Sequence, residues 1–269
     1  MTELLLHSMA ELAEIVLPSL EIAGARDVVE IGSEYGKMTE ALLAYTAAAG
    51  GTLVSVDPAP SAPAASLFDA HAHARLVSAR SMEALPALDA DAYLVDGDHN
   101  WHTVFHECGM MWANSRRSRR PFLALFHDAG WPWGRRDLYY DPSTIPPGYL
   151  QPHTWKHGVT LDVPGVVDGG FRGEGQWACA VREGGPRNGV LTAIEDFVEG
   201  KEGNLVWAMV PVVFGLGILF DRAAPWSDAL SEFLSPYHAH PLLERLERNR
   251  LECYLRVIEW QDRQRAQAA

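Results

Sequence analysis

The chain has 269 residues, 48% of them hydrophobic and 21% charged, which suits one large α/β domain with a small appendage. Its 35 acidic residues outnumber the 22 Lys and Arg, and the formal net charge of −13 argues against a nucleic-acid substrate. The three cysteines form no Cys-x-x-Cys pair, the N-terminus lacks the basic region of a signal peptide, and no apolar run suits a membrane span, so we expect a cytoplasmic protein.

Hydrophobic periodicity predicts helices alternating with strands along most of the chain. In chain order these are a helix at 2–22, a strand at 27–31, a helix at 36–49, a strand at 52–56, a helix at 64–73, a strand at 75–77, a strand at 92–95, a helix at 100–114, a strand at 122–126, a long irregular segment at 130–175, a helix at 188–198, a strand hairpin at 205–220 and helices within 225–262. Such alternation predicts a mostly parallel sheet with helices on both faces, whose ligands bind at the carboxyl ends of the strands. The basic cluster at 116–120 is expected to be a solvated loop.

The first strand runs into the pattern Glu30-x-Gly32-x-x-x-Gly36, and the second ends at Asp57. Glycines permit a tight turn where backbone approaches a ligand, and an acid at the second strand tip can accept hydrogen bonds from ribose hydroxyls. A dinucleotide fold would have Gly-x-Gly-x-x-Gly, and a carboxylate such as Glu30 would repel a pyrophosphate. The same carboxylate suits a cation such as S-adenosylmethionine, so a nucleotide-dependent dehydrogenase is disfavoured.

These residues resemble the first motif of class I S-adenosylmethionine-dependent methyltransferases, an acid-x-Gly-x-x-x-Gly loop after the first strand. The resemblance implies that the glycine loop and the second strand tip hold the cofactor, through Glu30, Gly32, Ser33, Gly36 and Asp57.

A second constellation follows the next two strands, as Asp96-Gly97-Asp98-His99 and His127-Asp128. It resembles a branch of the class I methyltransferases that includes macrolide-sugar O-methyltransferases and relatives of a cephalosporin-pathway hydroxylase. The resemblance implies that Ser81 and Met82 contact the adenine and that Asp96 lies near the methionine end of the cofactor. It also implies an acceptor hydroxyl on a natural product or a sugar.

Methyl transfer requires a base close to the acceptor hydroxyl, and a histidine is suited to that role near neutral pH. His127 and His99 are the two candidates, with Asp128 beside them. Alternatively, Asp96 and Asp128 could ligate Mg²⁺, which would orient and acidify the hydroxyl. Because Asp128 is followed by Ala129, the chain departs from the catechol-type pattern, and a third ligand would come from His127 or from the segment at 130–175.

The overall prediction is a Rossmann-like, doubly wound α/β fold with a mostly parallel seven-stranded sheet. Residues 1–224 would form the methyltransferase domain, with a lid insertion at about 130–175, and 225–269 a C-terminal helical extension that covers the core or forms a homodimer. Aromatic residues of the lid would line an acceptor pocket or pack the lid onto the sheet: Trp131, Trp133, Tyr139, Tyr140 and Trp155.

Two other functions remain open at this point. The first is an enzyme that uses S-adenosylmethionine for cyclisation or hydroxylation, which would yield no methylated acceptor. The second is a non-catalytic nucleoside-binding scaffold, which would bind its ligands unchanged without His127 and Asp128.

Overall fold

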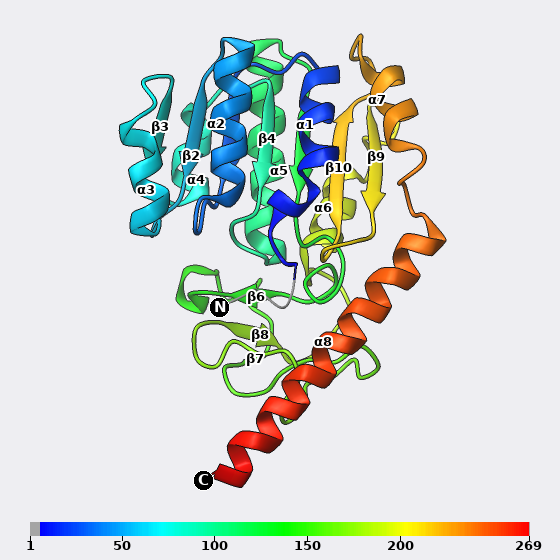
Figure 1. Cartoon of the computed structure of the whole chain (residues 1–269). Helices are drawn as coiled ribbons and strands as arrows, with labels where there is room; N and C mark the ends of the chain where they lie inside the picture. Colours follow the sequence, from blue (N-terminus) through cyan, green and yellow to red (C-terminus); the bar gives the residue numbers. More distant parts are fainter. Residues whose placement is uncertain (1–5, 269) are drawn as a thin grey trace.

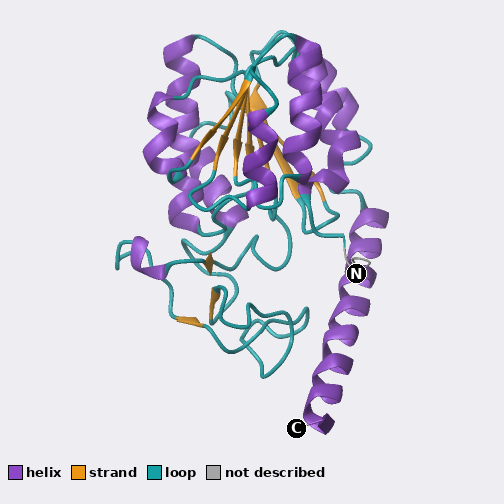
Figure 2. Cartoon of the chain, turned by 60° about the vertical axis from the view of Figure 1, so that its left-hand side comes forward, coloured by secondary structure: helices purple, strands orange, loops and turns teal. Residues whose placement is uncertain are grey.

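The computed structural model describes residues 6–268 and consists of a central sheet flanked by helices, a smaller sheet beneath it and a long C-terminal helix (Figures 1 and 2). The central sheet has the order β3-β2-β1-β4-β5-β10-β9. Its strands are β1 (Val28–Ile31), β2 (Leu53–Val56), β3 (Ala74–Val77), β4 (Ala92–Val95), β5 (Leu123–Phe126), β9 (Leu205–Val210) and β10 (Leu216–Asp221). The first five are parallel, and β10 runs antiparallel to both β5 and β9. The predicted seven-stranded, mostly parallel fold is therefore confirmed.

The central strands are buried on both faces because helices cover each side of the sheet. One apolar cluster joins the sheet to α1, α2 and α7, and the other joins it to α5 and α6. The helices are α1 (Ala13–Ile22), α2 (Lys37–Ala49), α3 (Ala62–Asp69), α4 (Ser81–Ala84), α5 (Trp101–Ser118), α6 (Val190–Val198), α7 (Ser227–Leu234) and α8 (Pro241–Ala268), with 3₁₀ turns η1 (Met9–Leu12), η2 (Leu85–Ala87) and η3 (Pro142–Thr144). None of the helices in the described part of the chain combines the length and the apolarity needed to cross a membrane.

Two local expectations need correction. The predicted helix at 2–22 is the short turn η1 followed by α1, and its positions 2–5 lie outside the described residues. The predicted loop at 116–120 is wrong in its first half, because Arg116 and Arg117 belong to the last turn of α5 and pair with Asp221 and Asp89. Basic side chains at a helix C-terminus interact favourably with its dipole, which favours helix over loop here.

Residues 130–189, between β5 and α6, form the insertion, which lies beneath the carboxyl ends of the parallel strands (Figure 1). Its three short strands, β6 (Leu138–Tyr139), β7 (His153–Thr154) and β8 (Ala178–Ala180), make an antiparallel sheet in the order β6-β8-β7. The buried carboxylate of Asp137 anchors it, accepting hydrogen bonds from the Trp101 and Gly189 amides at 2.7 and 2.6 Å. The insertion is thus tied to the start of α5, directly after the β4 loop.

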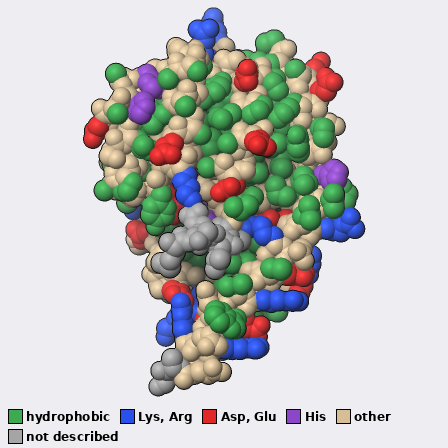
Figure 3. All heavy atoms as spheres, viewed as in Figure 1, with side chains coloured by type: hydrophobic (Ala, Val, Ile, Leu, Met, Phe, Trp, Pro, Cys, Tyr) green, Lys and Arg blue, Asp and Glu red, His purple; other side chains and the backbone are tan. Residues whose placement is uncertain are grey.

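Helix α8 leaves the sheet and runs along the insertion (Figures 1 and 2). Lys and Arg side chains gather on this lower half of the face shown in Figure 3. Ion pairs join α8 to the insertion: Arg172 with Asp262 at 2.6 Å, Arg248 with Asp162 at 2.7 Å, and Arg265 with Glu174 at 2.6 Å. The insertion and α8 therefore form a connected layer under the strand tips.

Candidate active site

The loop after β1 requires glycine at two positions. Gly32 has φ +84°, and a Cβ there would lie 2.2 Å from the Asp96 carbonyl oxygen. Gly36 has φ +83°, and its Cβ would lie 2.7 Å from the Leu67 side chain. At Gly32 the clash is with backbone and would force the loop away from the β4 loop, whereas at Gly36 the positive φ is the stronger reason for glycine, because the Leu67 side chain can move. The motif read from the sequence is thus explained by close packing of this loop against the β4 loop and α3.

Glu30 is buried on β1 and lines the cavity under the strand tips. Thr39 Oγ1 lies 2.8 and 3.0 Å from its two carboxylate oxygens. Burial raises the pKa of Glu30 to about 7, although the hydrogen bonds from Thr39 oppose that shift. A buried carboxyl with this pKa fits a cationic ligand, whose charge would favour the ionised form.

Asp57 is engaged with the glycine loop. Its Oδ2 accepts hydrogen bonds from the amides of Ser33 at 2.9 Å and Glu34 at 3.2 Å, and Oδ1 accepts one from the Ala59 amide at 2.8 Å. Among the predicted cofactor residues, Glu30, Gly32, Ser33 and Asp96 line the cavity. Four others in the described chain lie outside its lining: Gly36, Asp57, Ser81 and Met82. In this structure Asp57 orders the loop that would surround the cofactor.

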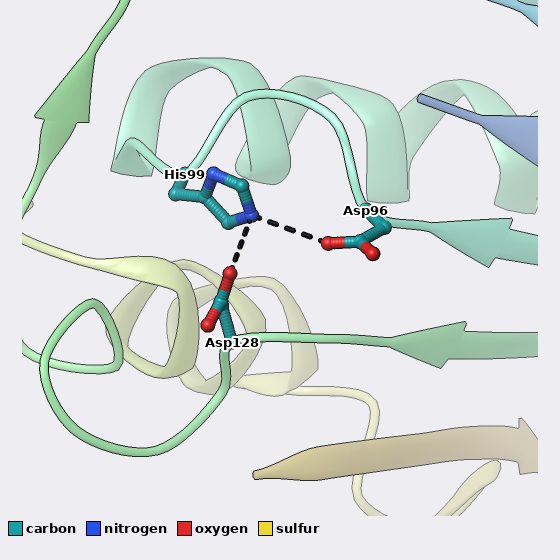
Figure 4. Close-up of side chains that lie close together, drawn as sticks. All are labelled: Asp96, His99 and Asp128. Carbon is teal, nitrogen blue, oxygen red and sulfur yellow. Dashed lines mark hydrogen bonds and ion pairs between the residues drawn. The ribbon is translucent and has the colours of Figure 1, made fainter. Parts of the chain in front are cut away.

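The tips of β4 and β5 bring two carboxylates and two imidazoles together. His99 Nε2 lies 2.8 Å from Asp128 Oδ2 and 3.4 Å from Asp96 Oδ1, between the two acids as Figure 4 shows. His127 Nδ1 lies 3.2 Å from Asp96 Oδ1 and 3.8 Å from Asp128 Oδ2. The second nitrogen of each ring, His99 Nδ1 and His127 Nε2, is buried without a hydrogen-bond partner among the described residues. The four predicted catalytic and metal residues thus form one cluster.

Opposite charges dominate the electrostatics of this His–Asp cluster. Burial alone would lower the pKa of each histidine, but Asp128 and Asp96 raise the pKa of His99 to about 10, and Asp96 and Asp128 raise that of His127 to about 9. Burial would raise the pKa of Asp96, but His127 and His99 hold it well below its ordinary value. Without a ligand, both imidazoles are therefore protonated at neutral pH.

The cluster also contains a set of metal-ligand atoms. One atom from each of Asp96, His99 and Asp128 lies within 4.8 Å of the others. The sequence analysis placed a third ligand on His127 or in the insertion, whereas the structure brings His99 into this set. The reason is side-chain direction, since the β4 loop returns His99 over the tip of β5 (Figure 4).

The cavity beyond the cluster has a volume of about 510 Å³. The insertion contributes Trp133, Tyr140, Phe171 and Trp177 to its walls. Helix α8 and the β9–β10 connection contribute four residues that the sequence analysis did not single out: Phe214, Tyr254, Val257 and Gln261. The α8 residues follow an i, i+3, i+7 pattern, which places them on one helix face and could have indicated a shared surface. Trp131 and Trp155 do not line the cavity.

Residues 29–129, less than half of the chain, match the family model described as a methyltransferase domain. The chain carries a class I methyltransferase domain. The matched region contains β1 to β5 with the glycine loop and the His–Asp cluster, and the antiparallel pair β9 and β10 completes the sheet expected of that class. The predicted S-adenosylmethionine-dependent methyltransferase is confirmed at the level of this domain, and the Asp-Gly-Asp-His branch stays a prediction.

Comparison with curated proteins finds no match. Solved structures that align with the chain include cofactor-bound Rv0187 from MTB, at 16% identity over 82% of this chain and 83% of that chain with a TM-score of 0.47. The O-methyltransferase TomG from Streptomyces achromogenes, in complex with SAM, aligns at 14% identity over 80% and 82% with a TM-score of 0.44. Methyltransferase PaMTH1 from Podospora anserina, bound to SAH, aligns at 13% identity over 76% and 74% with a TM-score of 0.43. The assignment rests on the domain match and the strand order, not on these distant alignments.

Proposed function

We propose that this protein transfers the methyl group of S-adenosylmethionine to a hydroxyl oxygen of a small-molecule acceptor. The observation that carries the proposal is one continuous cavity that joins Glu30 and the glycine loop to the His–Asp cluster and then to the aromatic walls. Residues 1–224 would form the catalytic domain with the insertion as its lid, and residues 225–269 the extension that adds a wall to the acceptor side.

The cofactor end would be formed by the matched domain. Glu30 would pair with the cofactor's ammonium, and Gly32 and Ser33 would bring backbone close to it, while Asp57 keeps the loop in shape through its two amide contacts. Gly36, Ser81 and Met82 are carried over from the family resemblance as further contacts. S-adenosylmethionine supplies an electrophilic methyl on a sulfonium, so the residues of the chain need only align the acceptor and remove its proton.

His127 is the proposed base. If its Nδ1–H donates to Asp96 at 3.2 Å, the unpartnered Nε2 keeps a lone pair to accept the hydroxyl proton. His99 places Nε2 between both acids, so its role is to balance their charge and hold Asp128 in position. This is an acid–histidine arrangement in which the acid selects the tautomer and orients the ring.

The raised pKa of His127 imposes a condition on this mechanism, because an imidazolium cannot accept a proton. A cationic ligand beside Asp96 would compete for the same negative charge and lower the pKa of His127 toward neutrality. Occupation of the cofactor end would therefore prepare the base, and activity would rise with pH in the range where His127 loses its proton.

A metal-assisted variant is favoured by the three ligand atoms of Asp96, His99 and Asp128. A divalent cation held there would lower the pKa of the acceptor hydroxyl. The cation would also need the lone pair of His99 Nε2. In the first mechanism that nitrogen carries a proton, which it donates to Asp128. The two mechanisms are mutually exclusive at that nitrogen, so chelation separates them.

The test is calorimetric titration with S-adenosylmethionine and its demethylated product, with and without Mg²⁺, followed by mass spectrometry of acceptor mixtures. Micromolar binding that is lost in Asp57→Ala, together with a mass gain of one methyl group, would support the proposal. Cofactor consumption without a methylated product would support the cyclase or hydroxylase alternative. Unchanged ligand binding and no turnover in a His127→Gln, Asp128→Asn double variant and in the wild type would support the scaffold.

The homodimer predicted from the C-terminal helices stays a prediction. Leu242, Leu246 and Trp260 leave a partly apolar face of α8 exposed, with 47%, 54% and 61% of their surfaces accessible. Sedimentation velocity of the full chain, compared with a Leu246→Glu, Trp260→Glu variant, would decide whether that face joins two copies.

A further inference from the structure

The outer part of the cavity is walled by aromatic rings from separate segments. Phe171, in the insertion, lies at their centre, with its ring centroid 5.9 Å from Trp133, 5.5 Å from Trp177 and 6.1 Å from Phe214. The ring centroid of Tyr254 on α8 lies 5.9 Å from that of Phe171. Centroid distances of this kind are typical of interacting aromatic pairs, so these five residues form a single surface, the aromatic chamber.

The charges are distributed unevenly along the cavity. Its described basic lining residues are His7, Lys37, His99 and His127, which come from the N-terminal segment, the start of α2 and the strand tips. The insertion and α8 contribute no Lys, Arg or His to the described lining, while Glu34, Asp96 and Asp128 face the same space. An anionic group in the aromatic chamber would be desolvated without a cationic partner, which disfavours carboxylate, sulfonate or phosphate on the acceptor.

Polar side chains are also few around the aromatic chamber. Gln261 on α8 is the one side-chain amide in the described lining, and the remaining polar side-chain groups of the outer walls are tyrosine hydroxyls and the N–H groups of Trp133 and Trp177. A sugar presents a hydroxyl on nearly every ring carbon, and each buried hydroxyl needs a hydrogen-bond partner. A flat aromatic ring needs few partners and fits against several ring faces and edges.

We propose that the aromatic chamber binds a neutral, planar aromatic acceptor, with its ring hydroxyl directed at the His–Asp cluster and its far edge at Gln261. This inference rests on the proposed methyl transfer and narrows its acceptor from small molecules in general to uncharged phenol-type compounds. Specificity then lies in the insertion and α8, outside the matched residues 29–129.

The test uses the full chain, titrated by calorimetry at pH 7.5 with three probes. 2-Naphthol is neutral and planar, 2-naphthalenesulfonate has the same rings with an anionic group, and methyl β-glucoside is a neutral polyol. Each titration is run alone and after saturation with S-adenosylhomocysteine. We expect 2-naphthol to bind at least tenfold more tightly than either other probe. Equal or tighter binding of the sulfonate or the glucoside, or no saturable binding of 2-naphthol, would overturn the inference.

A charge placed on α8 gives an independent measurement. Gln261→Arg adds a cation to the chamber wall, whereas Gln264→Arg adds the same charge one turn away, outside the described lining. We expect Gln261→Arg to tighten 2-naphthalenesulfonate binding by about tenfold, and Gln264→Arg to change it less than twofold, because only the first charge is desolvated beside the ligand. Equal effects of the two variants would show that the probe binds elsewhere.

Phe171→Leu keeps an apolar side chain but removes the central ring, and Tyr254→Leu does the same on α8. Each should weaken 2-naphthol binding at least fivefold while leaving S-adenosylhomocysteine binding unchanged. If one variant binds neither 2-naphthol nor S-adenosylhomocysteine, that variant is misfolded, and the other variant then tests the inference. If S-adenosylhomocysteine fails to bind the wild type, the proposed function fails, whereas S-adenosylhomocysteine binding with methylation of sugars only overturns this inference alone.

Discussion

Replacing Glu30 by Gln removes a buried charge and keeps the shape of the side chain. Burial raises the pKa of Glu30 from 4.5 to about 7, a difference of about 2.5 units, and each unit corresponds to about 1.36 kcal/mol. The ionised carboxylate therefore costs the folded state about 3 kcal/mol above pH 7. The Gln amide can still accept the Thr39 hydrogen bond and can donate to Ser55 Oγ, which is buried without another partner among the described residues.

The sign follows from proton linkage. Between pH 4.5 and 7 the folded chain binds the Glu30 proton more tightly than the unfolded chain, so wild-type stability falls as pH rises through that window. The Glu30→Gln variant does not lose stability in this way, and we expect its Tm to exceed that of the wild type by roughly 6–12 °C at pH 8, since about 1 kcal/mol shifts Tm by roughly 2–4 °C for a chain of this size. Near pH 4.5 the two Tm values should coincide.

The same Glu30→Gln substitution should weaken cofactor binding. Without the carboxylate, S-adenosylmethionine loses a charge-assisted hydrogen bond worth about 1.5–3 kcal/mol, so its affinity at pH 8 should fall about 10–100-fold. Differential scanning fluorimetry from pH 4.5 to 8 and calorimetry at pH 8 measure both effects, with Glu40→Gln on the exposed side of α2 as the control. A Tm difference that does not vary with pH, or unchanged affinity, would refute the argument.

Three other outcomes follow from the site. His127→Gln should lower kcat about 10²–10⁴-fold. Wild-type kcat/KM for S-adenosylmethionine, which reports the free enzyme, should rise with pH toward about 9, where His127 loses its proton, and a flat profile would exclude His127 as the base. Chelation with EDTA should leave initial rates within twofold, and a loss restored by Mg²⁺ would favour the metal mechanism at Asp96 and Asp128. Gly32→Ala should lower Tm and abolish cofactor binding, because its Cβ would meet the Asp96 carbonyl oxygen; a variant with wild-type calorimetry would contradict this packing.

The strand tips and the glycine loop of the proposed cofactor end could be predicted from sequence because their determinants are local. The apolar strands β1, β2, β4 and β5 each end directly at a polar residue, and parallel strands bring those ends to one edge of the sheet. The glycine requirement is similarly local in origin, since the positive φ at Gly32 and Gly36 strongly favours glycine over other residues. Proximity within the His–Asp cluster follows from topology alone, without any knowledge of side-chain rotamers.

What could not be predicted depends on rotamers and on long-range packing. The sequence analysis expected a third ligand from His127 or from the segment at 130–175, yet the return of the β4 loop places His99 between the two acids. Tyr254 and Gln261 lie more than eighty residues from Phe171, and they meet the insertion only because α8 crosses it. A helical pattern of apolar residues indicates that a face is covered, but not by which segment.

The two ends of the cavity therefore have different origins within the chain. The proposed cofactor residues lie inside the matched region at 29–129, on or beside the strand tips. The outer walls come mainly from the insertion and α8, with Phe214 from the β9–β10 connection. The insertion and α8 are joined to each other by ion pairs such as Arg172 with Asp262. Substitutions in this layer can change which acceptor fits without disturbing Glu30 or the His–Asp cluster. A site divided in this way allows acceptor specificity to change while the methyl-transfer chemistry stays the same.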